Sequence, residues 1–337
     1  MGRQKLIKII GIVLAALVVG GVAMGILLVD KMKNITPDAA FTPPASVPPP
    51  LTLEPNGSEA GTYEYDSDII NILLLGIDTD EERQEWGWGY RTDAMMIVSI
   101  NRISHKISML SIPRDSYANV DTLDENGEVV QTYQSKINTA FGKGGNDVKN
   151  RFKNSVSAVE TFLAEGGAPV LINNYIGVDM EGFGRIADSL GGIPVTLEMN
   201  VPNIGQKGES VVLNGEQALE FVRERSAFLT ADIARAQNQQ SFIKGMAQRV
   251  NELGAVQTAT RLYDEFLSFV ETDLNMDQIL ALANMFSELD MEDMNRYILP
   301  GSPKDIMTGA GTQNFWIVDF EKARPELVKM FYVKIGN

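Results

Sequence analysis

The residues best suited to chemistry are arginines gathered near position 230. The segment 221–240 holds Arg223, Arg225 and Arg235 beside Gln239. A planar guanidinium donates two parallel hydrogen bonds to phosphate oxygens, so a group of arginines suits a phosphate or pyrophosphate ligand. The alternative interpretation is that these charged side chains only lie on solvent-exposed faces of helices. Arg235 and Gln239 would share a face of one helix, whereas Arg223 and Arg225 would share a face only in an extended segment.

Charged residues also occur at the ends of three expected strands. They are Asp78 after the first strand, Arg91-Thr92-Asp93 before the second, and Pro113-Arg114-Asp115 after the third. Ligands of sheet-and-helix folds bind at such strand ends. Two carboxylates, Asp78 and Asp93, suit Mg²⁺ or Mn²⁺, because such hard ions take one or two carboxylates together with phosphate oxygens. Taken singly, each residue is also explained as a turn former, a helix cap or a solvated ion pair.

The elements that must position these residues follow from hydrophobic spacing. The apolar run 69–75 predicts a strand covered on both faces, and 95–101 with 106–112 predicts a hairpin whose turn contains His105. Apolar periodicity and glycine stops predict further strands at 173–178 and 193–197 and helices at 147–165, 181–190, 232–253, 258–270 and 276–286. Strands and helices alternate, which predicts one α/β domain over 67–337.

A further helix is expected to begin at Asn214, because Gln217 stands three residues later in the arrangement of a capping box. If Arg223 and Arg225 act together, this helix must end near Phe221.

Composition excludes several classes of function. The formal net charge is -15, which argues against nucleic acid as a partner, since binding it needs a basic surface. The chain has no cysteine, so disulfides, thiolate metal sites and thiol nucleophiles are excluded. It has one histidine, His105, whose place in a predicted turn makes a histidine-based mechanism unfavourable.

The N-terminus predicts attachment to a membrane. Residues 9–29 are free of charge and long enough to span a bilayer, and Arg3, Lys5 and Lys8 precede them. By the positive-inside tendency, residues 1–8 form a cytoplasmic tail and the rest lies outside. Residues 30–66 contain many prolines and few apolar residues, which predicts an extracytoplasmic linker.

The order of motifs resembles the LytR-CpsA-Psr family over residues 69–337. The motifs are NILLLGID, RTD, KISMLSIPRD, KIN, LNGEQALEFVRER and DIARAQNQQ. The resemblance implies a mixed central sheet flanked by helices, an apolar pocket for a polyprenyl tail, and bound Mg²⁺. It further implies transfer of teichoic acid, capsule or a similar glycopolymer from polyprenyl pyrophosphate to a peptidoglycan hydroxyl.

The resemblance also assigns roles to residues. Asp78 and Asp93 would hold the metal and pyrophosphate, with Arg114 as a catalytic partner, and the remaining group would bind pyrophosphate oxygens: Arg91, Arg223, Arg225, Arg235 and Gln239. The chain departs from the family pattern in having Asp80 two residues after the first aspartate and Asn238 before the paired glutamines. These departures put the outer phosphate contacts and the choice of polymer in doubt.

Two other functions remain open. A pyrophosphatase that releases the same lipid-linked polymer to water would use the same groups, and only the acceptor distinguishes it. A non-enzymatic surface regulator that binds lipid or glycan is the second alternative, although a tail of eight residues is too short for a DNA-binding helix-turn-helix.

Overall fold

The computed structural model describes residues 36–42, 44, 46–53, 60–78, 90–224, 231–253, 270–286, 294–309 and 311–336. The chain divides into two units. One comprises residues 1–43 and 275–288 and contains α3 (Pro37–Ala40) and α11 (Met276–Phe286), which pack against each other. The other comprises residues 44–274 and 289–337 and contains the remaining described elements. In the described part of the chain no helix has the length and apolarity of a membrane span, and the predicted span at 9–29 lies outside that part.

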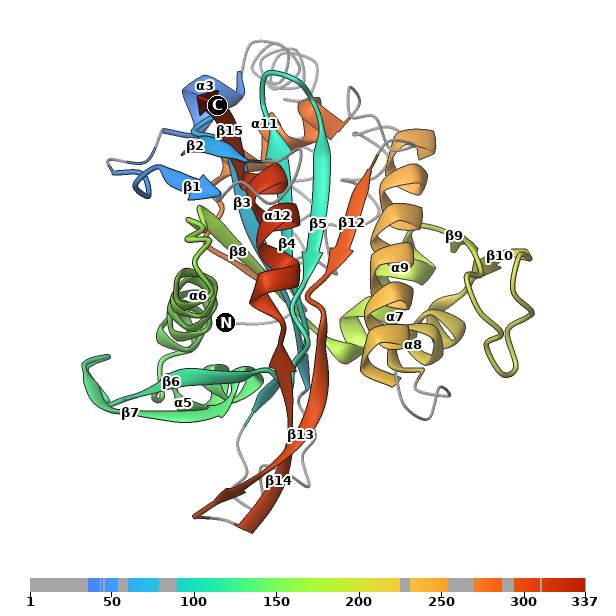
Figure 1. The fold of residues 1–337 in the computed structure, drawn as a ribbon. Coiled ribbons are helices and arrows are strands. Elements are labelled where there is room, and N and C mark those ends of the chain that lie inside the picture. The colour runs from blue at the N-terminus through green and yellow to red at the C-terminus, as the bar shows by residue number, and fades with distance from the viewer. Residues whose placement is uncertain are drawn as a thin grey trace, which may run out of the picture. The chain divides into compact units, whose positions relative to one another are not determined.

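The larger unit is built on a mixed sheet of six strands in the order β11, β8, β3, β4, β5 and β12 (Figure 1). Their bounds are β3 (Ile69–Asp78), β4 (Arg91–Asn101), β5 (Ile107–Ser111), β8 (Asn174–Asp179), β11 (Val270–Thr272) and β12 (Asn295–Ile298). β3 is antiparallel to β4 and parallel to β8, while β5 is antiparallel to β4 and parallel to β12. The predicted mixed sheet and the 95–101/106–112 hairpin are confirmed, and His105 lies in the hairpin turn with φ of 56°.

Helices cover both faces of this sheet, which explains why β3 is apolar at almost every position. On one face Leu73, Leu75 and Ile97 join a core that α6 (Val148–Glu165) and α12 (Phe320–Phe331) complete. α7 (Met180–Ser189), α8 (Gly215–Arg223) and α9 (Ala231–Leu253) lie together on the other side in Figure 1. The predicted helices at 147–165, 181–190 and 232–253 are therefore confirmed within a few residues.

The predicted start of α8 at Asn214 is confirmed, because the capping box expected from the Asn214–Gln217 spacing is present. The Asn214 side chain accepts from the backbone N–H of Gln217, and the Gln217 side chain accepts from the Asn214 N–H. This closed capping box satisfies two N–H groups that the first helical turn leaves without partners. The helix continues to Arg223, two residues beyond the predicted end, and Arg225 lies outside the described residues.

Smaller sheets surround the central one. Their strands are β1 (Leu51–Leu53), β2 (Gly61–Tyr65), β6 (Tyr117–Leu123), β7 (Val129–Lys136), β9 (Ile193–Thr196), β10 (Ser210–Leu213), β13 (Gly301–Thr308), β14 (Gly311–Val318) and β15 (Tyr332–Gly336). β6 with β7, β9 with β10, and β13 with β14 form antiparallel pairs, and β2 pairs with both β1 and β15. A short helical segment formed by η1 (Ile137–Thr139) and α5 (Ala140–Lys143) follows β7.

Two predicted boundaries need correction. Residues 51–53 and 61–65 are strands rather than linker, because Tyr63 and Tyr65 alternate along β2 and pack into the core. The predicted helix at 258–270 falls mostly outside the described residues, and its last residue, Val270, begins β11 instead.

Candidate active site

The predicted aspartates lie where β3 and β4 run side by side at one end of the sheet. Asp78 pairs in register with Arg91, and Ile77 pairs with Thr92, but the next pair is Gly76 with Ala94. Asp93 is therefore the extra residue of a β-bulge. Bulges increase the local twist and re-aim a side chain, and they are frequent beside active sites. The prediction that residues 91–93 precede the second strand is wrong, because the ladder continues through the bulge to Arg91.

Asp93 holds the guanidinium of Arg114, which follows β5. Nη1 of Arg114 donates to Oδ1 of Asp93 over 2.6 Å, and both side chains are mostly buried. An ion pair shielded from water in this way is screened less by salt than a surface pair. The structure thus brings together two residues that the sequence placed 21 positions apart, and it gives Arg114 a fixed orientation.

Several polar atoms near this pair are buried without a hydrogen bond in the described part of the chain. They include Nε of Arg91 and Oγ1 of Thr92. Buried polar atoms nearly always have a partner, so atoms of this kind call for an explanation such as a ligand. Guanidinium nitrogens at the end of a sheet suit an anionic ligand.

α8 and α9 carry Arg223 and Arg235, and the predicted Arg225 lies outside the described residues. Nδ2 of Asn238 donates to the Phe221 carbonyl over 3.1 Å, and Nε2 of Gln239 donates to the Val222 carbonyl over 3.3 Å. Both amides thus satisfy carbonyls that the end of α8 leaves without helical partners. Arg223, the last residue of α8, is exposed. The departure at Asn238 therefore has a structural reason, and the observed contact of Gln239 is to the backbone.

Arg235 and Gln240 show how α9 is placed over the sheet. Arg235 is 4% exposed and has a buried Nη1 that makes no hydrogen bond within the described residues, although its side chain interacts elsewhere. Gln240 donates to Oγ of Ser111 and to the Tyr297 carbonyl, both over 3.0 Å. These two hydrogen bonds hold α9 against β5 and β12. Ser111, the partner on β5, stands three residues before Arg114 in the sequence. This role of Gln240 was not predicted from the sequence, although the run of amide side chains at 237–240 was a visible signal.

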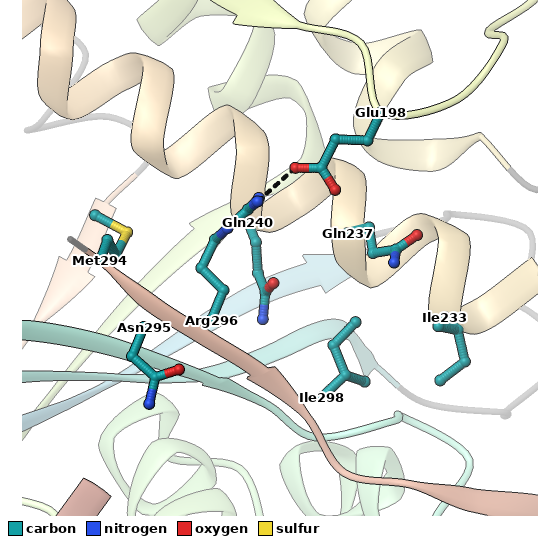
Figure 2. Close-up of a pocket in the computed structure, with 8 residues that line it drawn as sticks. All are labelled: Glu198, Ile233, Gln237, Gln240, Met294, Asn295, Arg296 and Ile298. Carbon is teal, nitrogen blue, oxygen red and sulfur yellow. Dashed lines mark ion pairs between the residues drawn. The ribbon is translucent and has the colours of Figure 1, made fainter. Parts of the chain in front are cut away.

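A pocket of about 740 Å³ runs between α9 and β12 (Figure 2). Its lining residues are Glu198, Ile233, Gln237, Gln240, Met294, Asn295, Arg296 and Ile298. Three of these are apolar and the rest are polar, so the lining is mixed. Nη2 of Arg296 and Oε1 of Glu198 form an ion pair of 2.6 Å at one side of the pocket.

The residues present fit a metal ion that is bound together with a phosphate. Asp78 and Asp93 are hard oxygen donors on two adjacent strands, with Asp78 opposite Arg91 and Asp93 in the bulge two residues further along β4. No group of three or more acidic or histidine side chains that could hold a metal occurs among the described residues. Mg²⁺ commonly takes one or two carboxylates and completes its shell with phosphate oxygens and water. The pair therefore suits an ion carried by the substrate better than a cage made by the protein alone.

Comparison with known proteins places the chain in a family. A family model, the LytR_cpsA_psr family, matches residues 52–329, so the chain belongs to that family. A relative from Bacillus cereus (strain AH820), named polyisoprenyl-teichoic acid--peptidoglycan teichoic acid transferase TagU, is 30% identical over 295 residues, which cover 86% of this chain and 85% of the relative. A protein of the same name from Oceanobacillus iheyensis is 32% identical over 231 residues, covering 66% of this chain and 64% of that one. The crystal structure of B. subtilis TagV has the same fold, with a TM-score of 0.59 and 24% identity over 78% of this chain and 97% of that one.

Proposed function

We propose that this chain is an extracytoplasmic phosphotransferase that moves a teichoic acid or similar glycopolymer from a polyprenyl-pyrophosphate carrier to peptidoglycan. The names of relatives that match most of the chain support the reaction. The structural observation that supports it is the Arg114–Asp93 pair at the β3–β4 bulge, beside the buried Nε of Arg91. The acidic net charge of -15 agrees with a partner other than nucleic acid.

The arrangement suits transfer at phosphorus. A peptidoglycan hydroxyl attacks the phosphorus atom bonded to the polymer, a new P–O bond forms, the hydroxyl proton is released, and polyprenyl phosphate leaves as the old P–O bond breaks. Negative charge grows on the leaving phosphate, and fixed guanidinium groups stabilise it most strongly in the transition state. Arg91 and Arg114 supply such groups at the strand ends. Arg223, Arg225 and Arg235, with Gln239, are proposed to bind the remaining oxygens.

Asp78 and Asp93 are the residues that would hold Mg²⁺ or Mn²⁺. Such an ion neutralises charge on the diphosphate oxygens. Asp93 also orients Arg114, so its two contacts would bring the guanidinium and the ion to the same phosphate.

The lipid part of the carrier needs an apolar surface close to the arginines. Ile233 of α9 lines the pocket together with Ile298 and Met294. We assign the first part of the polyprenyl chain to this pocket. In Figure 2 Ile233 and Ile298 lie toward one end of the pocket, and Met294 lies toward the other.

Product analysis tests the proposed reaction and separates it from its alternatives. The chain without residues 1–35 is incubated with a polyprenyl-pyrophosphate-linked teichoic acid, peptidoglycan and Mg²⁺. We expect polymer covalently attached to peptidoglycan and an equal amount of polyprenyl phosphate. Free polymer phosphate without attachment would identify a pyrophosphatase. An unchanged lipid-linked polymer that stays bound to the protein would identify a binding protein.

The place of action is also part of the proposal. Residues 9–29 are proposed to span the membrane with residues 1–8 in the cytoplasm, so that the catalytic unit faces the wall and its lipid-borne substrate. Removal of residues 1–35 should leave turnover of a soluble short-chain substrate intact and sharply reduce polymer attachment in cells, because local concentration at the membrane is lost. Normal attachment in cells by the truncated chain would contradict the role of the anchor.

A further inference from the structure

The hairpin of β13 and β14 projects from the larger unit and adds little to its core (Figure 1). Phe315 anchors it, because this ring is 1% exposed and packs against Tyr117 with the ring centroids 4.8 Å apart. Over 305–308 and 311–314 the residues of both strands are exposed or partly exposed. A two-stranded hairpin that buries so little surface contributes little to stability, so its length calls for another explanation.

The root of this hairpin is joined to the segment that carries Arg114. The Trp316 N–H donates to the Asp115 carbonyl over 2.9 Å, and Trp316 forms an isolated parallel bridge with Ser116. Asp115 directly follows Arg114 in the sequence. The root of the hairpin therefore lies beside the candidate site.

The register of the two strands divides the hairpin into two faces. Cross-strand partners share a face, and so do residues two apart along a strand. One face, which we call the outer face, contains three partner pairs: Pro303 with Trp316, Asp305 with Asn314, and Met307 with Thr312. The opposite face contains Phe315, which packs against Tyr117, so the outer face is turned to solvent and Met307 is 76% exposed. At about 3.4 Å per residue, the row from Trp316 to Thr312 extends over about 14 Å.

The outer face combines an aromatic ring with hydrogen-bonding groups. The Trp316 indole lies over Gly301, where a Cβ atom would come within 2.6 Å of the indole Nε1. Nδ2 of Asn314 donates to Oδ1 of Asp305 over 2.8 Å, which leaves the other carboxylate and amide groups of this exposed pair to contact a ligand. Among its described residues the outer face carries no lysine or arginine, and its charge is negative. Such a face suits a neutral sugar chain, which offers apolar C–H faces and hydroxyl groups, and it repels an anionic polymer.

We propose that the outer face of the β13–β14 hairpin binds the glycan strand of the acceptor and guides its hydroxyl to the candidate site. This inference rests on the proposed function, in which the arginines and aspartates serve the pyrophosphate and the metal ion. The acceptor must reach the same phosphorus atom, and the Trp316–Asp115 bond places the root of the hairpin beside that position. The glycan strand then lies along the row that begins at Trp316.

A pair of matched double variants tests whether the outer face binds the acceptor. Asp305→Ala with Asn314→Ala should raise the KM for soluble, uncross-linked peptidoglycan strands at least about fivefold, with a smaller change in kcat, because hydrogen bonds to two side chains are lost. Lys304→Ala with Gln313→Ala changes the opposite face of the same strands and should behave as the wild type. Melting temperatures check that both variants are folded. An unchanged KM in the folded Asp305→Ala, Asn314→Ala protein would overturn the inference.

Calorimetry on the full-length protein in detergent identifies the occupant of the outer face. Glycan strands stripped of their peptides should bind the wild type and the matched control equally. They should bind the Asp305→Ala, Asn314→Ala protein at least about fivefold more weakly. Equal binding by all three proteins would overturn the inference. Binding of only the free stem peptide, or of only lipid-free teichoic acid, would overturn the assignment of a neutral glycan.

The same proteins separate this inference from the proposed reaction. Inorganic pyrophosphate should bind the wild type and the Asp305→Ala, Asn314→Ala protein equally, and weaker binding to the variant would overturn a role confined to the acceptor. A wild type that transfers no polymer but binds glycan with the expected pattern would contradict the reaction and support the role of the outer face. A wild type that transfers polymer with one acceptor KM in every variant would do the opposite. A wild type that neither transfers polymer nor binds glycan would contradict both.

Discussion

Both ends of the β3–β4 strand pair bury polar side chains, but they satisfy them in different ways. At the Asn71 end, Nδ2 of Asn71 donates to the Tyr65 hydroxyl and to the Leu171 carbonyl, each over 2.8 Å, and its Oδ1 accepts from the Ser99 hydroxyl over 2.6 Å. At the Asp93 end, Nε of Arg91 and Oγ1 of Thr92 are buried without a hydrogen bond in the described part of the chain.

The Asn71 end of the sheet is suited to stabilising the fold, and the Asp93 end is suited to binding a ligand. A buried polar network whose members satisfy one another stabilises the fold and has no hydrogen-bonding capacity left for a ligand. Burying a donor without a hydrogen bond costs desolvation free energy, and the described part of the fold does not offset this cost at the bulge. A phosphate ligand would offset it by accepting hydrogen bonds from these donors. Substitutions at the Asp93 end should therefore reduce activity, and substitutions at the Asn71 end should reduce stability.

The largest expected effect is on activity at the Asp93 end. Arg114→Ala should reduce transfer by about 100-fold or more, because it removes a fixed donor whose contact is strongest in the transition state. Arg223→Ala should act in the same direction. Transfer rates and circular dichroism on the same samples check this. Near-normal turnover of folded Arg114→Ala would contradict the role of the Asp93 end in activity.

Substitution of Asp78 and Asp93 tests whether these carboxylates bind a metal ion. Asp78→Asn and Asp93→Asn should each weaken the dependence of the rate on Mg²⁺ or abolish activity, because the amide keeps the shape and removes the charge that holds a cation. The measurement is the rate against Mg²⁺ concentration. If both variants respond to Mg²⁺ as the wild type does, the two aspartates serve the fold alone.

The Asn71 end should show the opposite effect. Asn71→Ala should lower the free energy of unfolding by about 2 to 3 kcal/mol, because it leaves buried partners without hydrogen bonds and removes packed atoms. Turnover per folded molecule should stay unchanged. Urea unfolding measures the loss, with exposed Asn146→Ala as the control. A stable Asn71→Ala protein with reduced turnover would reverse the assignment of the two ends.

The smallest effect is a pH dependence from Tyr65 in the same network. Burial raises the pKa of Tyr65 from 10.0 to about 12. The folded state therefore holds this proton more tightly than the unfolded state, so its contribution to stability is fully present below pH 10. It is lost between pH 10 and about 12, at up to about 1.4 kcal/mol per pH unit. Unfolding free energies at pH 9 to 11 should show this slope, and Tyr65→Phe should reduce it; an equal slope in both proteins would contradict the assignment.

Local signals explain which parts of the fold were predictable. The continuous apolar run of β3 and the Asn214–Gln217 capping box depend on neighbours in sequence, and both elements were found where expected. The strand formed by residues 61–65 was missed because the prolines around it favoured a linker, while the alternation of Tyr63 and Tyr65 gave only a short signal. Its pairing with β15 joins residues more than 260 positions apart, which spacing alone does not reveal.

The candidate site was predictable in composition but not in geometry. Asp93 and Arg114 were chosen from their residue types and positions near strands, yet the bulge that re-aims Asp93 depends on the register with β3. The contact of 2.9 Å between Nζ of Lys136 and Oδ2 of Asp115 likewise joins the end of β7 to the segment that follows β5. Contacts of this kind depend on tertiary packing, so a motif such as KIN indicates a site without showing what its residues touch.

Calorimetry with a short-chain polyprenyl pyrophosphate in the presence of Mg²⁺ measures whether the Asp93 end of the sheet holds the ligand. The wild type and Asn71→Ala, compared at a temperature where both are folded, should bind it equally. Arg114→Ala should bind it at least about tenfold more weakly, since a charge-assisted contact to phosphate is lost. Equal binding by folded Arg114→Ala and the wild type would contradict the claim that the Asp93 end of the sheet holds the pyrophosphate.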